Sequence, residues 1–457
     1  MISAGAGWIQ PIPCSYPRPQ SRGDHGIDKY NCRPRGETEI SLVQQASSIQ
    51  DPFFEGFPIV QYSKSTMQLS IFKTAAFAVA LQTTSATPIR ARNDGLDVVA
   101  TTTTTNGQVI DWVVPESQLK GNVATPPAAP PATKRSAPSE LIRALLDRNA
   151  DAQGPNGTVP IPRTGTIAKG TKRLPTKKDD ENTFKIAAAA DGNAGQHWYA
   201  SSGQSVTNKG GKGTFSLFKA FTSNNADFSL LQTAVIRTNA AHAGTAAVTQ
   251  TVEAGWINYP NQVADPHLFS YFTTNGYSQD ADNVGGWNRD VAGWVQVDSQ
   301  LYPGVSFSPL STDGGDQYEL EIGYTLDSGN WWLWCLDRYI GYYPASLFSQ
   351  GVNAADTLAD HSDVIDFYGE IYNSQADLTS TDMGSGEFPA AGYGKSAYIH
   401  NIVYVNGDGN YADYNGQDQL VVSDTARYDI APSWSSGSSW GSYFYLGGPG
   451  AGGAIGA

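Results

Sequence analysis

The sequence predicts an all-β fold, with an antiparallel β-sandwich domain over residues 186–457 that is preceded by a signal peptide and a mixed, partly disordered propeptide. Charged residues make up only 16% of the 457 residues, whereas glycine (48), proline (26), tyrosine (23) and tryptophan (11) are plentiful. That mixture is typical of short strands joined by tight turns. In addition, short apolar runs alternate with turn-forming residues, and no stretch of the domain has the length and caps of a long helix.

A secretory signal peptide is predicted over residues 67–87. Met67 begins a short segment that contains Lys73, an apolar stretch follows at 74–81, and small residues at 84–86 suit a signal peptidase. The stretch is too short to span a bilayer as a stable helix. We therefore expect translation to start at Met67 and the protein to be secreted to the extracellular space. A buried helix inside a longer protein is the alternative.

Less regular regions flank this signal. Residues 1–66 are rich in proline and charge and show no sustained hydrophobic period, so we expect a disordered extension that comes from the gene model. Residues 88–185 contain a threonine run at 101–105, a proline-rich stretch and an amphipathic helix pattern at 139–148. We interpret residues 88–185 as a propeptide with an activation peptide and a linker.

The same region carries the predicted processing and modification sites. The dibasic pairs Lys134-Arg135 and Lys172-Arg173 lie in polar linkers that a processing protease could reach, so cleavage is predicted after Arg135 and after Arg173. Asn156 opens the sequon Asn-Gly-Thr and is the candidate glycosylation site.

Charge is distributed unevenly along the chain. Residues 1–185 hold 21 Lys/Arg against 16 Asp/Glu, and residues 186–457 hold 8 against 27, which gives the second part a net charge of −19 (8 − 27). Such a surface repels nucleic acid and anionic membranes, so neither is expected as a partner. Because self-repulsion falls as carboxylates become protonated, the composition also suits work at low pH, although acidity can simply confer solubility.

The β-rich domain reads as a series of short strands without disulfide support. Cys335 is its only cysteine, and its hydrophobic neighbours indicate a packing residue rather than a nucleophile. Turn formers such as Asp327-Ser-Gly329 and Asn406-Gly-Asp-Gly409 separate the runs. Strands are predicted at 228–236, 251–259, 267–274, 293–297, 317–324, 330–336, 339–344, 364–372 and 396–405.

Two glutamates lie inside these runs on a predictable face. Alternation puts Glu253 on the side opposite Val252, Ala254 and Trp256. In the run 367–372, Glu370 shares a face with Tyr368 and Tyr372. Such a side chain either lies on a solvated outer surface or lines a cleft.

Other reaction chemistries find little support. The segment Met383-Gly-Ser-Gly386 lacks the outer glycine of the serine nucleophile elbow, and no helix follows it. The histidines of the domain have neither HExxH nor any close ligand spacing, so we expect no metal and no other cofactor. Carboxylates remain, and two held close together divide into one that keeps its proton and one that acts as a base.

Several strings along the chain match those of a known family, in that family's order. They are Gly157-Thr-Val-Pro-Ile161, Phe228-Ser-Leu-Leu-Gln232, Val252-Glu-Ala-Gly-Trp256, Leu268-Phe-Ser-Tyr-Phe-Thr-Thr274, Gly329-Asn-Trp-Trp-Leu333, Ile340-Gly-Tyr-Tyr-Pro344, Tyr368-Gly-Glu370 and Thr381-Asp-Met-Gly-Ser-Gly386. Together these strings resemble the neprosin family of glutamic peptidases. The segment Asn106-Gly-Gln-Val-Ile-Asp111 also looks like the family's activation peptide.

The resemblance implies a β-sandwich endopeptidase that is made as a zymogen and cleaves proline-containing proteins or peptides at proline in acid, with its own propeptide as inhibitor. It maps the two catalytic glutamates to Glu253 and Glu370. One would activate water and the other would stabilise the tetrahedral oxygen and protonate the leaving nitrogen, in an order the sequence leaves open. Tyr368 and Tyr372 are candidate substrate-binding residues that could stack on proline.

The chain also departs from the family, and other functions stay open. Plant members have a cysteine pair where residues 275–286 stand here, so subsite preference is expected to differ. Carboxylates lined by tryptophan and tyrosine also fit a secreted carbohydrate-active sandwich, either a glycoside hydrolase or a binding module. A third alternative is a non-catalytic wall protein.

Overall fold

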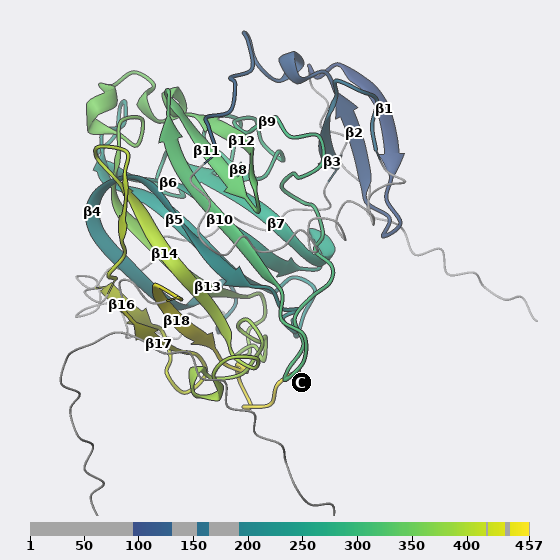
Figure 1. The fold of residues 1–457 in the computed structure, drawn as a ribbon, viewed down its shortest axis with the longest axis vertical. Helices are drawn as coiled ribbons and strands as arrows, with labels where there is room; N and C mark the ends of the chain where they lie inside the picture. The colour runs from purple at the N-terminus through teal and green to yellow at the C-terminus, as the bar shows by residue number, and fades with distance from the viewer. Residues whose placement is uncertain (1–94, 130–152, 164–191, 417–418, 435–438, 457) are drawn as a thin grey trace, which may run out of the picture. The chain divides into compact units, whose positions relative to one another are not determined.

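The structure is a computed structural model that describes residues 95–129, 153–163, 192–416, 419–434 and 439–456 (Figure 1). All of them belong to one unit of the chain, Gln82–Ala457. The expected extension at 1–66, the signal peptide at 67–87, the helix at 139–148 and the processing sites Arg135 and Arg173 lie outside the described residues.

The described part of the chain is almost entirely β-structure, and it contains short 3-10 helices but no α-helix. This confirms the predicted fold class. The 3-10 helices are η1 (Pro115–Gln118), η3 (Ala345–Ser349), η4 (Ala354–Asp356) and η5 (Pro389–Ala391). The strands are β1 (Val98–Thr103), β2 (Val109–Val113), β3 (Val159–Arg163), β4 (Gln196–Ser216), β5 (Phe228–Ala240), β6 (Val248–Tyr259), β7 (Val263–Thr273), β8 (Gly285–Trp287), β9 (Val295–Gln296), β10 (Glu319–Asp327), β11 (Asn330–Cys335), β12 (Arg338–Pro344), β13 (Ser362–Asn373), β14 (Ala397–Asn406), β15 (Tyr411–Asp413), β16 (Gln419–Val422), β17 (Asp429–Ser433) and β18 (Ser442–Gly447).

One large antiparallel sheet carries most strands, in the order β8-β7-β6-β5-β13-β4-β10-β11-β12-β9. Strand β4 is 21 residues long and curves in Figure 1. Its first part pairs with β13, and its second part, Gly210 to Ser216, pairs with β10. Gly210 lies at the change, with φ +122°, and a Cβ there would lie 2.0 Å from the Tyr324 carbonyl oxygen. A single strand therefore belongs to both halves of the sheet, and glycine is needed where its pairing changes.

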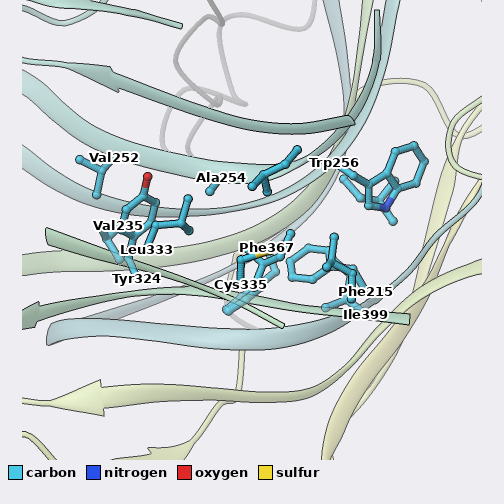
Figure 2. Close-up of a cluster of buried hydrophobic side chains, with 14 of the residues drawn as sticks. Phe215, Val235, Val252, Ala254, Trp256, Tyr324, Leu333, Cys335, Phe367 and Ile399 are labelled. Atoms are coloured by element: carbon cyan, nitrogen blue, oxygen red, sulfur yellow. The ribbon is translucent and has the colours of Figure 1, made fainter. Parts of the chain in front are cut away.

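The two halves enclose a common hydrophobic core. Val252, Ala254 and Trp256 of β6 belong to one buried cluster with Tyr324 of β10 and Leu333 of β11 (Figure 2). Their alternate neighbours point to the outer faces, as expected of a sandwich. Cys335 is a free, buried thiol in the same cluster, and burial raises its pKa, which confirms the packing role predicted for it.

The residues predicted as propeptide include a three-stranded sheet of their own. Strands β1, β2 and β3 pair in that order, so β2 joins β3 although the two are 46 residues apart (159 − 113). Buried Asp111 on β2 accepts two hydrogen bonds from Arg163 on β3, at 2.8 Å and 2.7 Å. The Gln118 side chain exchanges hydrogen bonds with the Gln296 backbone at 2.8 Å and 2.9 Å, which ties this region to β9.

Candidate active site

The register brings Glu253 and Glu370 to one face of the large sheet. Strand β5 lies between β6 and β13, with Glu253 opposite Ala234 and Glu370 opposite Leu230. Residues 230 and 234 are four apart on β5, an even spacing, so both glutamates point to the same side, away from the core cluster. Each glutamate is 0% exposed.

Glu253 is surrounded by neutral hydrogen-bond donors. Its Oε1 accepts from the hydroxyl groups of Tyr277 at 2.6 Å and Thr251 at 2.7 Å. Its Oε2 accepts from Gln232 Nε2 at 3.1 Å and, more weakly, from the Tyr368 hydroxyl at 3.4 Å. The pKa of Glu253 is raised to about 7, because burial and, to a lesser extent, the charge of Glu370 raise it more than the hydrogen bonds from Tyr277, Thr251 and Gln232 lower it.

Glu370 has a different environment, dominated by a histidine. His197 Nδ1 lies 2.5 Å from Glu370 Oε1, and the two side chains are 3% and 0% exposed. Burial raises the pKa of Glu370 well above its usual range, and hydrogen bonding by the Tyr199 hydroxyl opposes that rise. The two glutamates are therefore electrostatically coupled but supported by different partners.

The loop after β7 completes the surroundings of Glu253. Tyr277 has a left-handed backbone, φ +61°, and its backbone N–H donates to Thr273 Oγ1 at 3.1 Å. Its ring stacks on that of Tyr271, with 6.0 Å between centroids. A non-glycine residue in this conformation costs energy, so the surrounding contacts must hold it there. The loop belongs to the segment 275–286, for which the sequence predicts a changed subsite preference.

The two tyrosines predicted to bind substrate lie on the expected face with different contacts. Tyr368 is 2% exposed, and its hydroxyl already contacts Glu253. Tyr372 is half-buried, and its ring stacks on Phe228 at 5.4 Å and lies 5.0 Å from His197. The Tyr368 hydroxyl thus contacts a carboxyl group, whereas Tyr372 is partly exposed.

A third acidic side chain lies on the same face. Asp366 is opposite Ala234 in the register, as Glu253 is from the other side. Burial, followed by the charge of Glu253, raises the pKa of Asp366 to about 8. Sequence reasoning did not single out Asp366, nor did it single out His197, Gln232 or Tyr277.

The remaining predicted positions lie apart from this face or outside the described residues. Asn156 is exposed in a turn that precedes β3, where a glycan could be accommodated. Within the described ranges, no group of His, Cys, Asp and Glu side chains could hold a metal ion. The same ranges contain no helix that is long and apolar enough to cross a membrane.

Comparison with known proteins gives one family match. A family model described as Neprosin matches residues 225–449, a span that includes Glu253 and Glu370. The crystal structure of scytalido-glutamic peptidase with a transition state analog inhibitor is 9% identical, with a TM-score of 0.30 over 55% of this chain and 97% of that chain. A structure of SCP-B, a member of the Eqolisin family of peptidases, with the tripeptide Ala-Ile-His, is 8% identical with a TM-score of 0.28 over the same shares. Structural likenesses this weak carry no information about the chemistry of the site.

Proposed function

Because the chain belongs to the neprosin family through residues 225–449, we propose that it is a secreted, acid-active glutamic peptidase that is made as a zymogen and cleaves peptide bonds at proline. The observation that carries the proposal is the placement of Glu253 and Glu370, which are buried on one sheet face, electrostatically coupled and held by different donors. Two carboxyl groups in unlike surroundings can divide the roles of acid and base.

The reaction needs only these two groups and a water molecule. The ionised glutamate accepts a proton from water as the water oxygen attacks the scissile carbonyl carbon. The protonated glutamate donates to the carbonyl oxygen and stabilises the tetrahedral intermediate. When the C–N bond breaks, the leaving nitrogen takes the proton that the first glutamate received from water, and a hydroxyl proton of the intermediate returns to the second glutamate, so both glutamates return to their starting states.

Proline preference and acid adaptation have independent support. The half-buried ring of Tyr372 offers an aromatic surface on the carboxylate face, and the compact apolar ring of a substrate proline can pack against such a surface. The net charge of −19 over residues 186–457 falls in acid, which reduces self-repulsion there. The predicted signal peptide supports secretion, and the dibasic pairs at Arg135 and Arg173 support removal of a propeptide that inhibits the enzyme until it is cut.

The test is cleavage by the processed protein at pH 3 and pH 7, with a proline-rich peptide and a polysaccharide offered separately and the products read by mass spectrometry. We expect peptide cleavage next to proline at pH 3. Glu253→Gln and Glu370→Gln should each lower the rate by at least about a hundredfold, because each removes one proton-transfer group. Glu387→Gln, outside the site, is the matched control. Cleavage of the polysaccharide alone, or full activity of either site variant, would refute the proposal.

A further inference from the structure

His197 contacts Glu370, although 173 residues separate the two in the sequence. It lies on β4 opposite Tyr372 of β13, and Glu370 is opposite Tyr199 on the same strand pair. Two-residue alternation therefore puts the imidazole and the carboxyl group side by side on the site face. The Nδ1–Oε1 distance of 2.5 Å puts the two groups in direct hydrogen-bond contact.

Packing fixes the imidazole in this position. Its ring lies 5.0 Å from the ring of Tyr372, 5.9 Å from Phe228 and 6.4 Å from Tyr199. Aromatic rings from three strands thus restrict the rotation of the histidine. A ring held this tightly can present a proton to Glu370 with little loss of side-chain entropy.

We infer that His197 is the positioning residue that keeps Glu370 ionised in acid, which makes Glu370 the general base and Glu253 the general acid. This inference rests on the proposed peptidase function and assigns the roles within it. Burial alone would keep the Glu370 proton on its carboxyl group, but an imidazolium at hydrogen-bond distance favours the carboxylate. The donors to Glu253 from Tyr277, Thr251 and Gln232 are neutral, so they orient its carboxyl group without supplying a positive charge.

The proton balance follows from this assignment. In acid, His197 holds the shared proton, Glu370 is a carboxylate, and Glu253 carries its own proton. Glu370 then takes a proton from water, and Glu253 gives its proton to the carbonyl oxygen. On collapse of the intermediate, Glu370 protonates the leaving nitrogen and a hydroxyl proton returns to Glu253. His197 stays protonated throughout and never touches the substrate.

Other titratable groups near the imidazole do not replace it. Tyr199 and Tyr372 flank the ring, and burial raises the pKa of both phenols, so they stay neutral. The charge of Asp227, which directly precedes β5, contributes to the raised pKa of Tyr372, and that of Glu253 contributes to the raised pKa of Tyr199. In acid Glu253 is protonated and neutral, so it is the negative charge of Asp227 that adds to the potential favouring a protonated imidazole.

The first test is His197→Gln, which keeps a hydrogen-bond donor but removes the charge. At pH 4 we expect kcat to fall by about a hundredfold or more while KM stays within about threefold, and the pH optimum to move upward. His400→Gln is the matched control, because His400 is also buried and its Nε2 lies 3.1 Å from Glu319 on another part of the sheet. A folded His197→Gln variant with wild-type kcat and an unchanged pH profile would overturn the inference.

A second measurement needs neither activity nor a folded His197 variant. The protonation of the imidazole is followed by 15N NMR of labelled histidines in the wild-type protein and in Glu370→Gln. We expect the His197 imidazole to stay protonated to higher pH in the wild type, because the Glu370 carboxylate stabilises the cation. A neutral His197 at pH 4 would contradict the inference. Failure of the peptidase proposal is recognised separately, by an active Glu370→Gln variant or by a wild-type protein that cuts no peptide.

Discussion

Tyr277→Phe isolates one hydrogen bond at the candidate site. The substitution removes the hydroxyl group that donates to Glu253 Oε1 at 2.6 Å and leaves the ring that stacks on Tyr271. This hydrogen bond favours the ionised form of Glu253. Its loss should therefore raise the pKa of Glu253 above the present value of about 7.

The size of the effect follows from the strength of the bond. A hydrogen bond to a charged group contributes about 1.5–3 kcal/mol, and a pKa difference of 1 corresponds to about 1.4 kcal/mol. The pKa of Glu253 should thus rise by about 1 to 2. If Glu253 is the general acid, it must be protonated to work, and the alkaline limb of the pH–rate profile should move upward by the same amount.

The assay is kcat/KM for an internally quenched proline peptide between pH 3 and pH 9, because this ratio reports ionisations of the free enzyme. Tyr393→Phe is the matched control, since Tyr393 is 58% exposed and lies outside the site. Movement of the acidic limb instead would identify Glu253 as the base. A profile in which neither limb moves would refute the reasoning.

Four further outcomes are expected. The pKa of Glu253 is raised in the folded protein, so its contribution to stability is fully present below about pH 4.5 and is lost as pH rises through about 7. Tm should therefore be lower at pH 8 than at pH 4. The loss of folding free energy from this group is up to about 3 kcal/mol. Asp366→Asn should reduce this decline, measured by the same melting curves, because it removes a carboxyl group with a pKa of about 8. Cleavage after Arg135 should leave β1 and β2 bound through the pairing of β2 with β3, so the fragments should co-elute on gel filtration. Asp111→Asn should weaken that retention by about 1.5–3 kcal/mol, because it removes the carboxylate that holds Arg163.

The fold and the faces of the two glutamates could be predicted because both depend on local alternation. The predicted runs at 228–236, 251–259 and 364–372 fall within β5, β6 and β13, and their alternation gives the correct outward face. Strand β4 was not predicted, since Gly203, Gly210 and Gly211 interrupt its pattern. Those glycines are required by close neighbours, such as the Asp366 carboxyl group, whose Oδ1 would lie 2.1 Å from a Cβ on Gly203.

The partners of the glutamates could not be predicted, because their contacts span long stretches of sequence. His197 reaches Glu370 only after β4 pairs with β13, and Gln232 reaches Glu253 only after β5 pairs with β6. A weak signal existed in each case. His197 and Tyr199 alternate with Trp198 and Ala200, and Gln232 alternates with Leu231 and Thr233, but only the register says which acid each polar residue faces.

The segment that contains Met383 packs on one face of β13, and Glu370 lies on the other face. Gly369 lies between Tyr368 and Glu370 and points to the core, where a Cβ would lie 2.7 Å from Met383 Sδ and 2.9 Å from Leu446 Cδ1. Met383 is fully buried and thus fills the space that the glycine leaves. Its segment resembles a family motif, yet its contact with β13 is one of packing on the side away from Glu253 and Glu370. The position of Glu370 therefore depends on the close packing of Met383 and Leu446 against the adjacent Gly369. A sequence motif near a candidate catalytic residue can thus consist of residues that hold it in place rather than residues that take part in the reaction.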